Sequence, residues 1–388
     1  MSDVVGATGA WREGDPVGDR RFVEVGSIPL ERGGEIPDVT LAYESWGRLA
    51  DDGRNAVLVL HALTGDSHVV GEVTDGHPSP GWWDDLVGPG KPLDTDRWFV
   101  VAPNVLGGCQ GSTGPASIAS DGRPWAGRFP WLTIRDLVTA EARLTDALGI
   151  GEWAAVLGGS MGGMRVLEWG AMYPDRVRGL APLAVSATAT ADQIGLQSIQ
   201  IQAIRSDPHY RDGGYLDAAH DDPSAPGPHA GLTLARRIAH WSYRSREEFS
   251  LRFGRAPQGE EDPLAGGRFA VQSYLDHHGE KLARRFDAVS YVLLTAAMNS
   301  HDVGRDRGGV ATALRRVTGE VVVAGIDSDR LYPLEEQHAL AHHLRVPGER
   351  ATVIRSPYGH DGFLIESRQV GRIVTDLLDR VGGAPRGG

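Results

Sequence analysis

Trp153-Ala-Ala-Val-Leu157, a short apolar run, is followed at once by Gly158-Gly-Ser-Met-Gly162 and then by a helical pattern. The pattern G-x-S-x-G between a strand and a helix is typical of a nucleophile elbow, which lifts a serine hydroxyl above the edge of a sheet. A Gly-rich turn can also bind a dinucleotide, but the G-x-G-x-x-G spacing is not met here. The context therefore predicts Ser160 as a nucleophile at a helix N-terminus, rather than an ordinary strand-to-helix turn.

Other apolar runs place this turn in a larger sheet. Runs without polar alternation suit strands that are buried on both faces, as in a parallel sheet. They comprise Ala56-Val-Leu-Val-Leu60, Trp98-Phe-Val-Val-Ala102, Val321-Val-Val-Ala324 and Ala351-Thr-Val-Ile354. Residues 133–148 lie between two of the runs and show helical periodicity. The alternation predicts a doubly wound, mostly parallel α/β sheet with right-handed crossovers.

The middle of the chain lacks a convincing strand. Residues 191–206, 232–244 and 269–286 have helical patterns, and polar loops rich in Gly and Pro, 210–229 and 254–267, divide them. We therefore expect an α/β core over residues 20–187 and 301–381, with a helical lid inserted at 188–300. The ends, 1–19 and 382–388, are expected to be flexible.

Composition excludes several classes of function. The chain of 388 residues has 39 Lys and Arg against 51 Asp and Glu, a formal net charge of −12, so we expect no nucleic-acid partner. No apolar run approaches the roughly 18 residues of a membrane span, and the N-terminus does not resemble a secretory signal. The single cysteine, Cys109, excludes an internal disulfide and fits a reducing cytoplasm. The histidine pairs 277–278 and 342–343 lack metal-ligand spacing, so no metal site is predicted.

A serine nucleophile needs a base and an acid that orients it, and α/β hydrolases supply them in the order Ser, Asp, His. Gly325-Ile-Asp-Ser-Asp-Arg-Leu-Tyr-Pro333 follows one predicted strand, and Tyr358-Gly-His-Asp-Gly362 follows the last one. His360 is the expected general base. Asp329 is the preferred acid, because its spacing to Pro333 leaves it in the loop beyond the strand, and Asp327 is the alternative.

Two backbone N–H groups are expected to form an oxyanion hole. One belongs to Met161, the residue after the nucleophile, and the other to the loop after the strand 56–60, which reads His61-Ala-Leu-Thr-Gly65. We assign the second donor to Leu63. This loop could also be a plain turn that begins near Gly65.

Taken together, several motifs resemble the homoserine O-acetyltransferases of the α/β-hydrolase type over about residues 20–380. They are Leu60-His-Ala-Leu-Thr-Gly-Asp-Ser-His68, Asn104-Val-Leu-Gly-Gly-Cys-Gln-Gly-Ser-Thr-Gly-Pro115, Gly158-Gly-Ser-Met-Gly-Gly163, Thr133-Ile-Arg-Asp136, Ala235-Arg-Arg-Ile-Ala-His240, Arg285-Phe-Asp287, Ser328-Asp-Arg-Leu-Tyr-Pro333 and Tyr358-Gly-His-Asp-Gly-Phe363. The resemblance implies transfer of an acetyl group from acetyl-CoA to the hydroxyl of L-homoserine, a step of methionine synthesis. It also implies a cytoplasmic homodimer joined by the lid helices, with no bound cofactor.

The resemblance places the triad on Ser160, Asp329 and His360, and the homoserine contacts on Arg236, Tyr243 and Asp361. Charge supports these contacts, because a zwitterionic amino acid needs a cation for its carboxylate and an anion for its ammonium. The donor could instead be succinyl-CoA, and the acceptor could be L-serine. A plain esterase and a catalytically silent binding scaffold remain as hypotheses of other classes; the intact triad argues against the scaffold, and the pair Arg236 and Asp361 argues against the esterase.

Overall fold

The structure is a computed structural model and describes residues 6–383. Nine strands of this part form one sheet, in the order β1-β2-β6-β3-β7-β8-β10-β11, and β9 pairs with β8. Its strands are β1 (Arg21–Pro29), β2 (Glu35–Trp46), β3 (Ala56–Leu60), β6 (Phe99–Pro103), β7 (Ala155–Gly159), β8 (Gly179–Leu183), β9 (Glu320–Val321), β10 (Ala324–Ile326) and β11 (Thr352–Ile354), while β4 (Val87–Gly88) and β5 (Leu93–Asp94) pair separately. The pairs β1–β2 and β2–β6 are antiparallel, and the other pairs of the sheet are parallel. The predicted mostly parallel α/β fold is confirmed.

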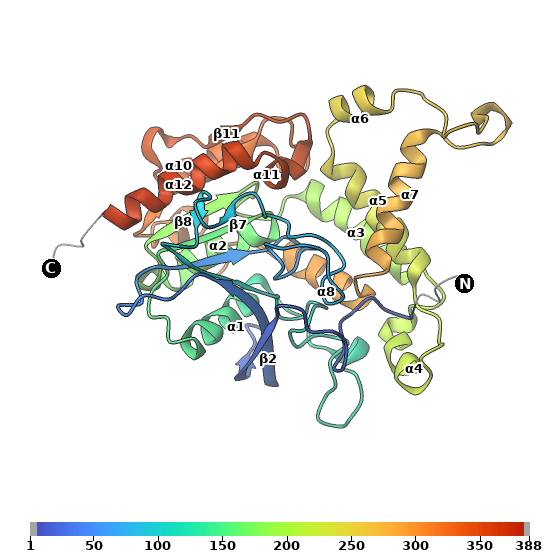
Figure 1. Ribbon diagram of the computed structural model, residues 1–388, viewed down its shortest axis with the longest axis horizontal. Helices are drawn as coiled ribbons and strands as arrows, with labels where there is room; N and C mark the ends of the chain where they lie inside the picture. The colour runs from blue at the N-terminus through green and yellow to red at the C-terminus, as the bar shows by residue number, and fades with distance from the viewer. Residues whose placement is uncertain (1–5, 384–388) are drawn as a thin grey trace.

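Helices cover both faces of the sheet and form a separate layer at one end (Figure 1). They are α1 (Ile134–Ala147), α2 (Met161–Met172), α3 (Ala191–Arg205), α4 (Tyr215–Asp221), α5 (His229–Tyr243), α6 (Arg246–Arg252), α7 (Ala270–Ala283), α8 (Ala288–Asn299), α9 (Val310–Leu314), α10 (Leu334–His343), α11 (Gly362–Ile365) and α12 (Ser367–Gly383). None of the helices within residues 6–383 combines the length and the apolar character that a membrane crossing requires.

The central strand β3 shows why its sequence is apolar throughout. Side chains alternate between the faces of a strand; Leu58 faces the core that includes Leu137 of α1, whereas Val57 faces the core that includes Leu377 of α12. All five residues of β3 are buried, so each face loses apolar surface to water, worth about 1.5–3 kcal/mol for each large side chain. A polar residue on either face would forfeit that stabilisation.

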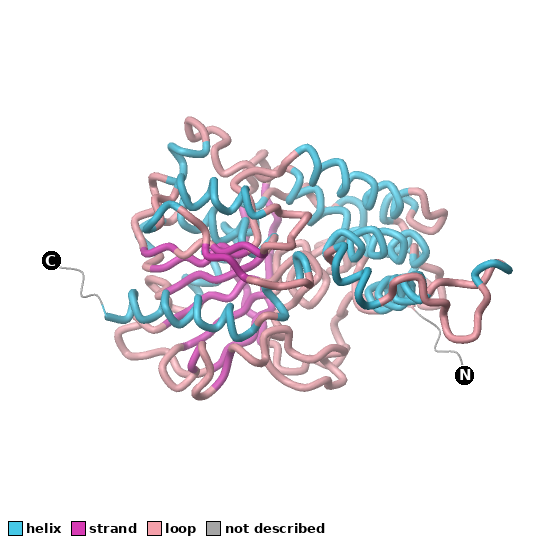
Figure 2. The backbone as a smooth tube through the Cα atoms, turned by 90° about the horizontal axis from the view of Figure 1, so that it is seen from above, coloured by secondary structure: helices cyan, strands magenta, loops and turns pink. Residues whose placement is uncertain are grey.

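The segment between β8 and β9 is helical, and its long helices lie beside the sheet, at the end of the molecule away from the C-terminus (Figure 2). Helix α5 packs between α3 and α7, and α8 is buried on nearly every side. The expected loop 210–229 contains helix α4, whose Tyr215 is buried and donates a hydrogen bond to Asp287, 2.5 Å away.

The N-terminal end, expected to be flexible, includes a segment near residues 7–10 that packs against the rest of the chain. Ala7 and Ala10 are buried, and the Gly9 N–H donates to the carbonyl of Phe286, so this segment packs against the loop that precedes α8. Its short side chains gave no periodic signal that could have predicted this contact. At the other end, residues 382 and 383 complete α12. Residues 1–5 and 384–388 of the expected flexible ends lie outside the described residues.

Candidate active site

Ser160 sits in the sharp turn between β7 and α2. Its backbone has φ 57° and ψ −124°, a conformation that a non-glycine residue rarely adopts. Ser160 is the N-cap of α2, and its backbone N–H donates to the carbonyl of Leu183 on the neighbouring strand β8. The strained turn is therefore held from both sides, as expected for an elbow that presents a side chain above the sheet edge.

Glycines on either side of Ser160 make this turn possible. A Cβ on Gly158 would lie 2.8 Å from the carbonyl carbon of Gly162, and a Cβ on Gly162 would overlap the carbonyl oxygen of Leu60. On Gly163, a Cβ would lie 2.8 Å from the side chain of Val185. The spacing G-x-S-x-G thus records the close approach of α2 to strands β3 and β8.

Asp329 and His360 form a buried pair at the same sheet edge. The His360 Nδ1–H donates to Asp329 Oδ2 over 2.6 Å, and Asp329 Oδ1 accepts the backbone N–H groups of Leu331 and Tyr332 at 2.8 and 2.9 Å. These bonds fix the carboxylate, which in turn fixes the ring and leaves Nε2 as the proton acceptor. The alternative acid is placed elsewhere, because Asp327 accepts the Ser356 N–H and pairs with Arg355.

Ser160 and His360 follow the carboxyl ends of two parallel strands of the sheet, β7 and β11. The Tyr332 ring stacks on the His360 imidazole at 5.1 Å, and burial raises the pKa of the Tyr332 hydroxyl. His360 Nε2 is buried and makes no hydrogen bond with any described residue. A reacting group that enters between Ser160 and His360 would therefore find an unoccupied base.

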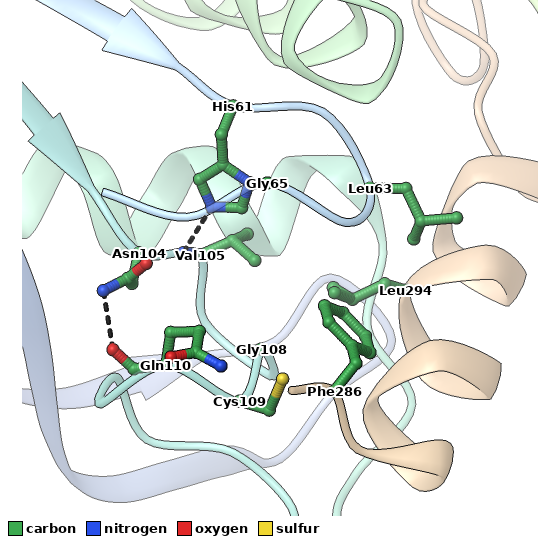
Figure 3. A pocket seen from close by; sticks show the side chains of 10 residues that line it. All are labelled: His61, Leu63, Gly65, Asn104, Val105, Gly108, Cys109, Gln110, Phe286 and Leu294. Atoms are coloured by element: carbon green, nitrogen blue, oxygen red, sulfur yellow. Dashed lines mark hydrogen bonds between the residues drawn. The ribbon is translucent and has the colours of Figure 1, made fainter. Parts of the chain in front are cut away.

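The ionisation of His360 reflects two opposing effects. Burial lowers its pKa, but the charge and the hydrogen bond of Asp329 raise it more, so the pKa lies above the usual value of 6.5. Cys109, the other candidate nucleophile by chemistry, is buried, and burial raises its thiol pKa strongly. It lines a small pocket behind the loop after β3 together with His61, Leu63 and Phe286 (Figure 3). The cysteine is therefore a neutral thiol away from the triad.

The expected oxyanion-hole donors lie at the start of α2 and in the loop after β3. Met161 is the first residue of α2, where backbone N–H groups have no partner within the helix. Leu63 is buried in the loop, which His61 fixes: its Nε2 accepts the Val105 N–H, and its Nδ1–H donates to the carbonyl of Ala62. Burial, then the nearby Arg165 charge, lowers the His61 pKa to about 3, so the ring is neutral.

Arg165, for which the sequence suggested no role, supports this loop. Its guanidinium is fully buried, donates to the carbonyl of His61 and pairs with Glu141 of α1 at 2.7 Å. Trp169 Nε1–H donates to the other Glu141 oxygen at 2.8 Å. The visible signal was a charge inside an otherwise apolar helix pattern, which indicates a buried ion pair.

The three expected acceptor residues converge near the triad. Arg236 of α5 lies over the Tyr243 ring at 5.3 Å, and Tyr243 lies 5.7 Å from the His360 ring. Arg236 also donates a hydrogen bond to the hydroxyl of Thr64, in the loop after β3, at 3.3 Å. Asp361 follows His360, but its Oδ2 already contacts Nε of Arg244 at 3.1 Å, a partner that the sequence did not predict.

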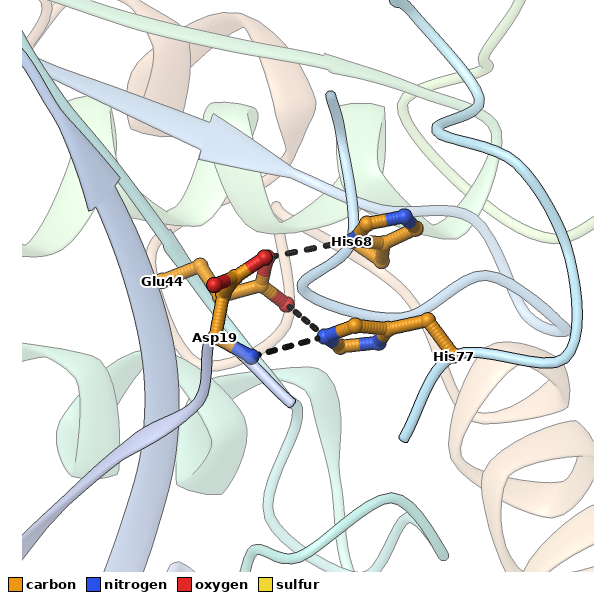
Figure 4. A group of neighbouring side chains, drawn as sticks. All are labelled: Asp19, Glu44, His68 and His77. Carbon is orange, nitrogen blue, oxygen red and sulfur yellow. Dashed lines mark hydrogen bonds and ion pairs between the residues drawn. The ribbon is translucent and has the colours of Figure 1, made fainter. Parts of the chain in front are cut away.

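A second polar cluster has residue types that can ligate a metal. Ligand atoms of Asp19, Glu44, His68 and His77 all lie within 4.8 Å of one another (Figure 4). The arrangement does not suit an ion, however, because the two imidazole rings are stacked 3.8 Å apart at 8°, so their lone pairs run parallel. His77 Nε2 accepts the backbone N–H of Asp19, and both His68 nitrogens face acceptors, the Glu44 carboxylate and the carbonyl of Glu72.

This cluster instead anchors the chain just after the loop that follows β3. Glu44 of β2 accepts hydrogen bonds from the Ser67 hydroxyl at 2.7 Å and from His68 at 3.2 Å. Burial lowers the His68 pKa, but the hydrogen bond and charge of Glu44 raise it more, so a protonated His68 is favoured. The loop after β3 is therefore tied to β2 as well as to α2.

The fold, the elbow and the buried Asp–His pair define an α/β hydrolase. In agreement, the family profile described as the alpha/beta hydrolase fold matches residues 55–367. The solved structure of esterase E22 shares this fold with a TM-score of 0.81 and 24% identity, covering 92% of this chain and 99% of its own.

Closer relatives narrow the class. A homoserine O-acetyltransferase from Thermobifida fusca is 63% identical over 374 residues, covering 96% of this chain and 97% of that protein. One from Mycobacterium tuberculosis is 56% identical over 373 residues, covering 95% and 96%. A crystal structure of homoserine O-acetyltransferase from Bacillus anthracis superposes with a TM-score of 0.83 at 25% identity, covering 93% and 97%. The chain belongs to the homoserine O-acetyltransferase family, and it is an acyltransferase.

Removing the Asp329 charge should change both the rate and its pH dependence. His360 must be neutral to accept a proton, so activity falls as pH drops through its raised pKa. In Asp329→Asn the pKa is lower and the ring loses its orienting acceptor, so we expect a loss of about 10⁴-fold in rate, with the acidic limb at lower pH. Thiol release from acyl-CoA across pH measures both. Asp327→Asn is the control, and an equal loss there would contradict the assignment.

Loss of the Arg165 side chain should lower the free energy of unfolding. Arg165→Met leaves the Glu141 carboxylate buried without its cation, so we expect the free energy of unfolding to fall by about 3–5 kcal/mol. Urea denaturation followed by circular dichroism measures this. The double variant Arg165→Met with Glu141→Gln should recover part of the loss, and a double variant as unstable as the single one would refute the ion-pair explanation.

Proposed function

We propose that the protein transfers an acetyl group from acetyl-CoA to the side-chain hydroxyl of L-homoserine through an acetyl-enzyme on Ser160. The observation that carries this proposal is the buried Asp329–His360 pair, whose Nε2 has no partner among the described residues, in a member of the homoserine O-acetyltransferase family. The acetyl donor and the homoserine acceptor are taken from the names of relatives that match nearly the full chain. The product, O-acetyl-L-homoserine, is consistent with a role in methionine synthesis in the cytoplasm.

In the first half-reaction, Ser160 Oγ attacks the thioester carbonyl while His360 Nε2 takes its proton. The N–H groups of Met161 and Leu63 stabilise the oxyanion of the tetrahedral intermediate, a contribution of several kcal/mol to lowering the barrier. The C–S bond then breaks, and His360 returns the proton to the coenzyme A thiolate. An acetyl ester remains on Ser160, and no bound cofactor takes part.

In the second half-reaction, His360 accepts the proton of the homoserine hydroxyl, which attacks the acetyl carbonyl. The bond between the acetyl carbonyl carbon and Ser160 Oγ breaks, and Oγ recovers its proton from His360. Arg236 offers a planar guanidinium to the acceptor carboxylate, Asp361 offers a carboxylate to its ammonium, and Tyr243 packs between Arg236 and His360. The acceptor would thus be held by both charges beside the base.

Hydrolysis is the second candidate, because water competes for the same acyl-enzyme. Solved structures of similar fold include the acetyl esterase MekB, with 25% identity and a TM-score of 0.77. The paired charges of Arg236 and Asp361 favour transfer, since a simple ester offers nothing for either to bind. The two reactions are separated by whether L-homoserine accelerates turnover and captures the acetyl group.

Thiol release during the first turnover tests the proposal. Purified enzyme mixed with acetyl-CoA alone should release about one coenzyme A per active site, and intact-mass spectrometry should find one acetyl group, absent in Ser160→Ala. Adding L-homoserine should restore continuous turnover and yield O-acetyl-L-homoserine. Succinyl-CoA and L-serine, in parallel reactions, test the alternative donor and acceptor. Product formation without any adduct on Ser160 would refute the ping-pong mechanism.

We further propose that the protein is a homodimer joined through its lid helices. Large apolar side chains are exposed on two adjacent helices, Ile199 of α3 at 57% and Leu234 and Trp241 of α5 at 46% and 49%. Leu234 and Trp241 are seven residues apart and thus share one helical face. Such a patch on a monomer is typical of an interaction surface.

Charged substitutions at this surface should dissociate the dimer. Ile199→Asp combined with Leu234→Asp should shift the sedimentation coefficient to that of a monomer, because each buried carboxylate would face an apolar partner surface. Leu264→Asp, on an exposed residue outside α3 and α5, is the matched control. A wild-type protein that sediments as a monomer at micromolar concentration would contradict the proposal.

A further inference from the structure

The C-terminal end of lid helix α5 packs against both loops that carry the acid and the base. Arg330 directly follows Asp329, and its guanidinium lies 3.9 Å from the Trp241 ring centroid. It donates to the carbonyl oxygens of Trp241 and Ser242, which lie in the last turn of α5. Carbonyls at a helix end lack partners within the helix and favour a cation, so Arg330 ties the acid loop to α5.

The base loop is tied to the same helix end by close packing. The Ser245 hydroxyl donates to the carbonyl of Pro357, and Gly359 has φ +67°. A Cβ on Gly359 would lie 2.5 Å from the Tyr243 carbonyl oxygen and 2.8 Å from the Ser245 nitrogen. The chain just beyond α5 therefore lies directly on the backbone that precedes His360.

Arg244 lies in the middle of this contact and pairs with Asp361. The Arg244 Nε to Asp361 Oδ2 distance is 3.1 Å, and the side chains are only 13% and 15% exposed. Arg244 also contacts Glu248 at 3.4 Å, and Glu248 contacts Arg252 at 3.5 Å, so the cluster alternates in charge. Because Arg244 engages Oδ2, the carboxylate keeps Oδ1 for a further cation.

We propose that Arg244 is a positioning residue for the acceptor: it orients the Asp361 carboxylate toward the acceptor ammonium and so favours amino-acid alcohols over water and over alcohols that lack the amine. This inference rests on the proposed function and deepens it. Arg244 pairs with Asp361, which is proposed to bind the acceptor and has no proposed contact with the donor. Loss of Arg244 should therefore impair the second half-reaction and leave the first one intact.

The position of Arg244 also explains how the carboxylate and the ammonium of the acceptor can be bound at the same time. Arg236 lies within α5 and Arg244 is the residue that ends it, so one rigid element presents the cation for the carboxylate and orients the anion for the ammonium. An acceptor with the wrong spacing between its charges cannot satisfy both. Rigid elements hold such constellations more accurately than mobile loops do.

The test compares Arg244→Gln and Arg244→Lys with the unmodified enzyme. The control is Arg237→Gln, which removes an arginine of the same helix that pairs with Asp276 of α7 at 3.2 Å. We measure the coenzyme A burst with acetyl-CoA alone, KM and kcat for L-homoserine, the ratio of O-acetyl-L-homoserine to acetate, and kcat/KM for 4-hydroxybutyrate, which is homoserine without its amine.

In Arg244→Gln we expect an unchanged burst, a rise in KM for L-homoserine of about tenfold or more, and more acetate for each product molecule. The preference for L-homoserine over 4-hydroxybutyrate should fall by about the same factor, and Arg244→Lys should restore part of it. Arg237→Gln should match the unmodified enzyme in every assay.

An unchanged preference for the amine, or a burst reduced in parallel with transfer, would overturn the proposal and leave Arg244 as a contact that merely joins lid and core. Should Arg244→Gln fail to fold, Arg244→Lys decides: a folded lysine variant with unaltered amine preference and KM refutes the orienting role. Absence of a burst in the unmodified enzyme would instead refute the acetyl-enzyme mechanism, so the two failures are distinguishable.

Discussion

The close approach of α2 to β3 and β8 is the constraint on which the rest of the structure depends. Ser160 keeps a positive φ only because its neighbours lack side chains that would meet Leu60 and Val185. The same approach brings α2 against the loop after β3, where buried Arg165 bonds to the His61 carbonyl. One packing contact thus has three consequences. It keeps the backbone of Ser160 strained, it places the N–H of Met161 at the start of α2, and it supports the loop that carries Leu63.

The sequence predicted those elements whose residues carry a local signal, such as an apolar run or a glycine-rich turn. Runs such as 56–60 read as buried strands because both faces of β3 are covered, and the helix boundary after Ser160 follows from the elbow itself. The antiparallel strand β1 was missed because it is largely exposed and its side chains show no apolar run. Strand β8 was missed because it is short and contains a proline, Pro182.

The candidate site also contains residues that the sequence could locate and pairs that only the structure shows. The location of Ser160, Asp329 and His360 at one sheet edge could be predicted because each follows a strand end, and parallel strands bring their carboxyl ends to one edge. Glu141 and Arg165, or Arg244 and Asp361, come from elements whose packing no local pattern specifies, so their pairing required the structure. Of these, only Arg165 left a trace in the sequence, as a charge within an apolar helix pattern.

The proposed acceptor contacts and the Asp329–His360 pair share one support, the C-terminal end of α5. Arg330 bonds to its carbonyls next to Asp329, and the chain beyond it rests on Gly359 next to His360. Arg236 and Tyr243, which are proposed to contact the acceptor, belong to the helix itself. A shift of α5 would therefore move the acid, the base and the acceptor contacts together. In the proposed reaction an amino-acid alcohol would bridge Arg236 and Asp361 and so hold this arrangement, whereas water carries neither charge. The proposed selectivity for transfer would then follow from the same contacts that hold the acid and base loops in place.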